Sequence, residues 1–117
     1  MDFNQNKPIY LQIADSICEK ILSGEYLPDE RILSVRELGI SLGVNPNTIA
    51  RVYEHLQGME IIYNKRGIGY FVSADAPERI LQMQRDEFLK NELPAMVKKM
   101  KLLGVSLEEL ERMLTGE

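Results

Sequence analysis

The sequence predicts an α+β fold: an N-terminal winged helix-turn-helix of three helices and a β-hairpin wing, followed by a small C-terminal helical appendage. Three observations predict it. Residues 34–58 hold two short amphipathic segments joined by a tight turn, and residues 61–73 hold two β-rich runs around a glycine turn. Residues 75–117 are largely helical in character. We therefore place a winged helix-turn-helix domain in residues 1–74 and a helical tail in residues 75–117.

The first helix is expected from Pro8 to about Leu22, where isoleucines recur at every fourth position. Gly24 ends it, and Pro28-Asp29 indicates a loop. Cys18 lies beside two of the isoleucines. As the single cysteine of the chain it can form no intrachain disulfide, and we expect it to be a small packing residue. The apolar stripe consists of Ile9, Ile13, Ile17 and Ile21.

A helix-turn-helix is predicted from Ser34 to Gly58. Ser34 can cap its first helix, with Glu37 at the capping-box position. Gly43 can supply the left-handed end of that helix, and Asn45 can cap the next helix, which has a proline in its first position. The apolar positions are Val35, Leu38 and Leu42 in the first helix and Ile49, Val52, Tyr53 and Leu56 in the second.

The second helix of a helix-turn-helix commonly enters the major groove of DNA. Opposite its apolar stripe lie polar side chains that can reach phosphates or base edges. Arg36 would face the DNA backbone or a guanine; the alternative is a surface ion pair with Glu37 or Glu54. Asn45 can serve as a cap alone, and Arg51 as a solvated surface residue. The candidate DNA contacts in this part of the chain are Ser34, Arg36, Asn45, Asn47, Thr48, Arg51 and His55.

A β-hairpin is expected next, because Ile61–Lys65 and Tyr70–Ser73 flank a glycine-containing turn. Residues 31–33 should form a short extended piece before the helix-turn-helix. A hairpin directly after a helix-turn-helix is a wing, and glycines at its tip let the backbone approach the minor groove closely. The wing residues expected to contact DNA are Lys65, Arg66, Gly67 and Gly69.

The tail should start near Asp75, and Pro94 should kink or split its long helix. Gly104 is a plausible helix end, and Ser106 begins a second capping box. So small a helical unit cannot bury its own apolar face, so we expect it to form a homodimer; the alternative is packing against the first helix of the same chain. The residues expected at the dimer interface are Leu81, Phe88, Leu89, Leu93, Met96, Val97, Met100, Leu103, Leu107 and Leu110.

The amino-acid composition argues against several classes of function. One histidine, one cysteine and no clustered carboxylates leave no catalytic, cofactor or metal site to expect. The polar segment Met1–Pro8 lacks the apolar run of a leader peptide, and no segment is apolar over the roughly 18 residues of a membrane span, so we expect a cytoplasmic protein. The net charge of −4 is unusual for a DNA-binding domain, which commonly carries a positively charged patch. We therefore expect each protomer to bind DNA with modest affinity, and stable binding to require two protomers together.

The same residues resemble the GntR family of bacterial transcription regulators. The resemblance covers Pro8 through Val72 and includes Ser34-Val-Arg-Glu-Leu38, Leu42-Gly-Val-Asn-Pro-Asn-Thr48 and Arg66-Gly-Ile-Gly-Tyr-Phe-Val72. The tail segment Leu103-Gly-Val-Ser-Leu-Glu-Glu-Leu110 is similar to the YtrA-like subgroup. That resemblance implies a tail that dimerises in place of a larger effector domain, and a repressor acting on an operon that often encodes an ABC transporter. The sequence does not identify a small-molecule effector.

The chain departs from the family pattern at three positions. The family usually has a glycine at Asp29, a proline at Leu33 and an alanine at Gly39, and we expect the second helix to be less stable here. A dimeric, sequence-specific regulator that binds double-stranded DNA at an inverted repeat is the leading interpretation. The alternative, suggested by the acidic balance, is a winged-helix protein-interaction module without specific DNA binding.

Overall fold

The computed structural model describes residues 7–116. The segment Met1–Asn6, which holds most of the polar N-terminus considered above, and Glu117 at the end of the tail lie outside the described residues. The chain forms two compact units, residues 1–81 and residues 82–117.

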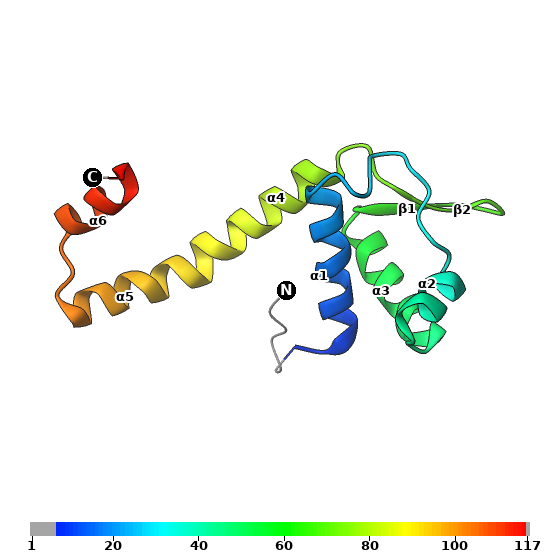
Figure 1. The fold of residues 1–117 in the computed structure, drawn as a ribbon, viewed down its shortest axis with the longest axis horizontal. Coiled ribbons are helices and arrows are strands. Elements are labelled where there is room, and N and C mark those ends of the chain that lie inside the picture. Colours follow the sequence, from blue (N-terminus) through cyan, green and yellow to red (C-terminus); the bar gives the residue numbers. More distant parts are fainter. Residues whose placement is uncertain (1–6, 117) are drawn as a thin grey trace. The chain divides into compact units, whose positions relative to one another are not determined.

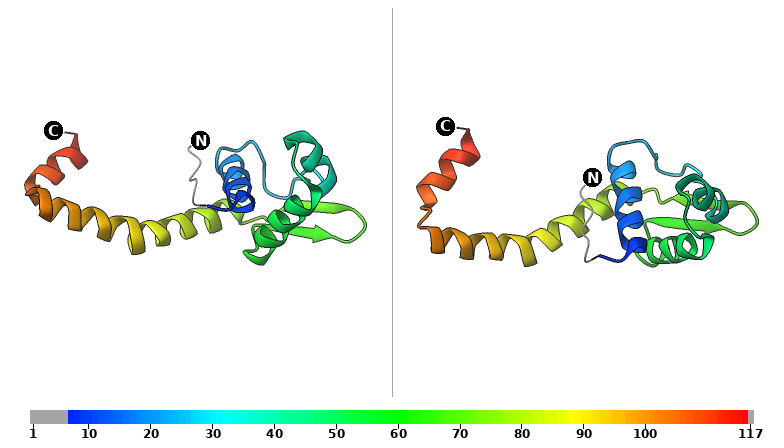
Figure 2. Two further views of the ribbon diagram at one scale, coloured as in Figure 1. Left: turned by 90° about the horizontal axis from the view of Figure 1, so that it is seen from below. Right: turned by 60° about the horizontal axis from the view of Figure 1, so that its bottom comes forward.

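The first unit is a winged helix-turn-helix, as predicted (Figure 1). Its helices are α1 (Ile9–Leu22), α2 (Val35–Leu42) and α3 (Pro46–Gly58). The strands β1 (Ile62–Lys65) and β2 (Gly69–Val72) pair antiparallel, with Ile62 opposite Val72. The two views in Figure 2 show the hairpin tip extending beyond the helices.

The expected extended piece before α2 lies along β2. Arg31 forms an isolated antiparallel bridge with Phe71. The Ile32 amide donates to the Tyr70 carbonyl oxygen at 3.0 Å, and the Val72 amide donates to the Glu30 carbonyl oxygen at 3.0 Å. Strand β2 is therefore hydrogen-bonded along both of its edges, to β1 on one side and to the segment that leads into α2 on the other.

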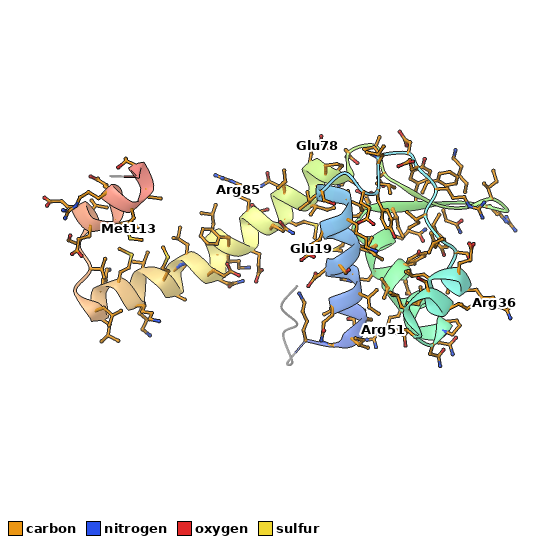
Figure 3. The ribbon with its side chains drawn as sticks, in the orientation of Figure 1. Glu19, Arg36, Arg51, Glu78, Arg85 and Met113 are labelled. Carbon is orange, nitrogen blue, oxygen red and sulfur yellow. The ribbon has the colours of Figure 1, made fainter. Side chains whose placement is uncertain are left out.

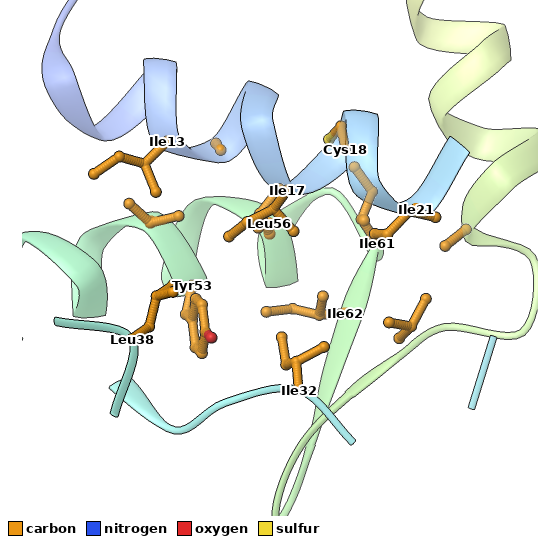
Figure 4. Packing of buried hydrophobic residues seen from close by; sticks show 14 of the residues in the cluster. Ile13, Ile17, Cys18, Ile21, Ile32, Leu38, Tyr53, Leu56, Ile61 and Ile62 are labelled. Carbon is orange, nitrogen blue, oxygen red and sulfur yellow. The ribbon is translucent and has the colours of Figure 1, made fainter. Parts of the chain in front are cut away.

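The core of the first unit lies between α1, α3 and the hairpin (Figure 4). Three of the four predicted isoleucines of α1 are buried, but Ile9 is 54% exposed because it stands in the first turn, beyond the end of the core. The apolar face predicted for α2 is also shorter than expected, since Leu42 is 46% exposed in the last turn. Cys18 is buried in the core, and burial raises the pKa of its thiol to about 12. It is the expected packing residue.

The predicted caps explain where α2 and α3 begin. The Glu37 amide donates to Ser34 Oγ at 3.0 Å, and the Ser34 amide donates to Glu37 Oε1 at 3.0 Å, which completes the capping box. Gly43 ends α2 in the left-handed conformation at φ 66°. Asn45 Oδ1 then accepts from the Asn47 amide at 2.8 Å and caps α3.

The helix α4 (Ala76–Glu87) begins in the first unit. Ala76 and Ile80 are fully buried in the core of that unit. Arg79 forms ion pairs with Asp75 and with Glu60, at 2.8 and 3.0 Å. The winged domain therefore uses the first turns of α4 as part of its own core.

The second unit continues as a π-helical turn, η1 (Phe88–Glu92), followed by α5 (Leu93–Leu103) and α6 (Leu107–Thr115). Pro94 does not split the helix. The turn just before it widens, and the Leu93 amide donates to the Phe88 carbonyl oxygen five residues earlier. Gly104 ends α5 at φ 72°, and Ser106 and Glu109 form the predicted capping box. No described residue from Gln82 to Gly116 is buried.

Candidate nucleic-acid interface

The outward face of α3 carries the polar residues that the sequence singled out. Asn47, Arg51 and His55 follow one another at intervals of four, so they lie along one side of the helix, and Thr48 lies beside them. The opposite side is buried in the core. Asn47 and Arg51 are exposed, whereas Thr48 and His55 are half-buried at the edge of the face.

Arg36 extends into solvent from the first turn of α2 (Figure 3). The ion pair with Glu37 or Glu54 considered above does not form. Glu37 is instead engaged in the capping box, where the hydrogen bond from the Ser34 amide is the main cause that lowers the pKa of its carboxyl group. Ser34 and Asn45 both serve as helix caps.

Arg51 does not lie free on the helix. Its guanidinium carbon stands 4.0 Å from the centre of the Tyr10 ring, which comes from the first turn of α1. The His55 ring meets the same tyrosine edge to face, with ring centres 5.9 Å apart. Tyr10 was not among the predicted site residues. The available signal was its position three residues before Ile13, at the edge of the buried stripe of α1.

Lys65 in the wing also makes a cation–π contact. Lys65 Nζ stands 4.6 Å from the centre of the Phe71 ring. On β1, Tyr63 stacks on Phe71 at 5.7 Å, and its hydroxyl donates to Asp29 Oδ1 at 3.1 Å. Loss of solvation and then that hydrogen bond raise the pKa of the Tyr63 hydroxyl. The aromatic pair thus links the cation near the wing tip to the loop before α2.

At the hairpin turn, Gly67 and Gly69 adopt φ values of 80° and 145°, which favour glycine over other residues. A Cβ atom on Gly69 would stand 2.9 Å from Arg31 Nε, so the Arg31 side chain lies directly over the start of β2. Arg31 is exposed. It was not among the predicted contacts, and it adds a third cation beside Lys65 and Arg66 at the wing.

Among residues 7–116, the ion pairs use Lys7 and Arg79 as their only cations, so Arg36, Arg51, Lys65 and Arg66 keep their charges uncompensated by a salt bridge. The same part of the chain holds no cluster of His, Cys, Asp and Glu that could bind a metal ion. None of its helices combines the length and the apolar character needed to cross a bilayer.

These features define a winged helix-turn-helix protein with exposed cations on α2, α3 and the wing. Residues 9–72 match the family model described as bacterial regulatory proteins of the gntR family. The chain is 41% identical over 108 residues to the uncharacterized HTH-type transcriptional regulator YhcF of Bacillus subtilis, covering 92% of this chain and 88% of that protein. It is 32% identical over 110 residues to the HTH-type transcriptional repressor YtrA of the same organism, covering 94% and 84%.

Among solved structures, a GntR family transcriptional regulator from Listeria monocytogenes superposes with a TM-score of 0.75 at 37% identity, covering 98% of this chain and 99% of that one. The chain therefore belongs to the GntR family and is a YtrA-like DNA-binding transcription regulator, not an enzyme.

Proposed function

We propose that this protein is a dimeric repressor that binds an inverted-repeat operator through α3 and the wing of each protomer. One observation carries the proposal. Four cations, Arg36, Arg51, Lys65 and Arg66, stand without ion-pair partners among the described residues, on the elements that meet DNA in a winged helix-turn-helix. The name of the similar protein YtrA supports repression as the direction of regulation.

The two parts of this face are expected to have different roles. Arg51 and Asn47 lie on the exposed side of α3, where they can reach base edges in the major groove. Lys65 and Arg66 stand at the wing, and the minor groove offers a more degenerate pattern to read. Replacing both wing cations with alanine should therefore weaken binding to operator and to random DNA by similar factors.

Dimerisation is supported by the second unit. Its described residues bury none of their side chains, and large apolar groups stay in solvent, with Phe88 at 43% and Leu103 at 65% exposure. Apolar residues recur along η1 and α5 at helical spacing. Exposed apolar residues that recur in this way are typical of an association site. A second copy of the tail is the partner that closed two-fold symmetry favours.

Two variants test the tail. Leu89→Glu places a charge in the proposed interface and should convert a dimer to a monomer in sedimentation experiments at micromolar concentration. Leu102→Glu is the matched control, because Leu102 is 84% exposed on α5 and is not among the proposed interface residues. A monomeric unaltered protein, or equal dissociation by both variants, would contradict the assignment.

DNA binding is tested on the upstream region of the protein's own gene by electrophoretic shift and footprinting. If Arg36, Lys65 and Arg66 each meet one phosphate, a dimer makes six such contacts, and affinity should fall by at least about 10³ between about 50 and 200 mM salt. A footprint over two half-sites is expected. Binding that does not respond to salt, or no binding, would favour the protein-interaction module. The resemblance to YtrA-like proteins makes a transporter operon the first regulated target to examine.

A further inference from the structure

The contact between Arg51 and Tyr10 joins two helices that have different tasks. Arg51 lies on the exposed side of α3, while Tyr10 belongs to α1, which has no predicted DNA contact. The guanidinium stands over the tyrosine ring at 4.0 Å from its centre. At this distance the guanidinium makes a cation–π contact with the ring, which restricts the positions that the arginine side chain can take.

Tyr10 is suited to hold another side chain in place. Its ring is half-buried and packs against the hydrophobic core of the winged domain. His55 meets the ring edge to face, so two residues of α3, His55 and Arg51, contact the tyrosine ring. Its hydroxyl has no hydrogen bond among residues 7–116, so the ring and not the hydroxyl makes the contacts.

We propose that Tyr10 is a positioning residue for DNA recognition: it stacks against Arg51 and sets the direction in which that arginine presents its N–H groups to the major groove. This inference rests on the proposed function. An arginine fixed before binding loses less side-chain freedom when it meets DNA, and its planar edge can make two parallel hydrogen bonds to a guanine. Tyr10 therefore affects sequence preference without touching DNA.

The test uses the full chain and three substitutions. Tyr10→Phe keeps the ring, Tyr10→Leu keeps an apolar side chain without the ring, and Arg51→Ala removes the cation. Tyr26→Leu is the matched control, because Tyr26 is also half-buried, packs on the core and lies under a cation, Lys20, at 5.3 Å. Affinity is measured for the footprinted upstream fragment and for a random duplex of equal length.

Tyr10→Phe should bind as the unaltered protein does, and Tyr10→Leu should weaken operator binding about 3- to 10-fold with a smaller change on random DNA. The double variant Tyr10→Leu/Arg51→Ala should be no weaker than Arg51→Ala alone, because the tyrosine acts through the arginine. Tyr26→Leu should leave the ratio of operator to random binding unchanged. A second readout needs no DNA: the NMR signals of the Arg51 side chain should show the ring-current shift of the tyrosine, kept in Tyr10→Phe and lost in Tyr10→Leu.

Equal losses in Tyr10→Phe and Tyr10→Leu, additive effects of Tyr10→Leu and Arg51→Ala, or no effect of Tyr10→Leu would each overturn the inference while the proposed function stands. Failure of the unaltered protein to bind DNA would overturn the proposed function and the inference with it. In that case the NMR readout still reports whether the two side chains stack, so the two failures are distinguishable.

Discussion

Replacing Gly39 with alanine tests how closely α2 and the turn before α3 are packed. Gly39 is buried in α2, and its carbonyl oxygen accepts a hydrogen bond from the Val44 amide at 2.9 Å. A Cβ atom there would stand 2.9 Å from the Val44 carbonyl oxygen and 3.5 Å from Pro46 Cα. The first contact is too short, so the backbone of the turn must move.

The magnitude follows from two opposing effects. Alanine favours the helical state over glycine by about 1 kcal/mol. Against this, the gap between Cβ and the Val44 oxygen must open from 2.9 to about 3.4 Å by a shift of backbone and not of a flexible side chain. Overpacking of this kind costs about 1–3 kcal/mol. Gly39→Ala should therefore lower the free energy of unfolding by about 1 kcal/mol, and Tm by about 4–8 °C if the winged domain unfolds as a unit.

Gly58→Ala is the matched control. Gly58 is the last residue of α3, and a Cβ atom there would meet nothing within 4 Å. That substitution should leave stability unchanged or raise it by up to about 1 kcal/mol. The assay is urea unfolding followed by circular dichroism. The reasoning is refuted if Gly39→Ala is as stable as Gly58→Ala, because the turn would then yield without cost. Gly39→Ala should also weaken DNA binding, since the turn that moves leads into α3.

Three further outcomes are expected. Ser34→Ala removes the cap of α2 and should cost about 0.5–2 kcal/mol in urea unfolding, with a Ser34→Asp variant close to the unaltered protein. Tyr53→Phe should cost about 1 kcal/mol, because it removes a 2.6 Å hydrogen bond from the buried hydroxyl. Burial raises the pKa of Tyr53, so its stabilising contribution is complete below pH about 10 and is lost as pH rises towards the folded-state pKa; the phenylalanine variant should lose less stability there. The Cys18 thiol, with its pKa raised to about 12, should react with iodoacetamide at pH 8 only as the domain opens, so its rate should rise with urea in parallel with unfolding.

The sequence predicted the elements of the winged domain well because their boundaries depend on local chemistry. The Ser34 capping box, the left-handed Gly43 and the Asn45 cap act within a few residues, and each is present as predicted. The π-helical turn was not predicted. Pro94 signals a disturbed helix, but whether the chain kinks, splits or widens depends on how the preceding carbonyl groups rearrange.

The contacts of the candidate interface were harder to predict because they join distant parts of the chain. Helical spacing placed Arg51 on the outer side of α3, but no local pattern relates it to Tyr10, forty-one positions earlier. Lys65 and Phe71 are close in sequence, but they meet diagonally across the hairpin, so their contact depends on the register of the two strands. The structure also accounts for two of the positions at which the chain departs from the family pattern, Asp29 and Gly39. Asp29 has φ 64°, a backbone conformation that favours the glycine expected there from the family resemblance, and Gly39 lets the turn approach α2 more closely than alanine would.

The net charge of −4 is a poor guide to what this face can bind, because charge acts locally at physiological salt. Within residues 7–116, the ion pairs engage Lys7 and Arg79, which lie outside the candidate interface. Glu37, the acid nearest to Arg36 in sequence, is held in the capping box of α2. The four cations of the face thus form no salt bridge within residues 7–116, and a second protomer would double their number. Affinity for DNA should therefore depend on the dimer more strongly than on the total charge of the chain.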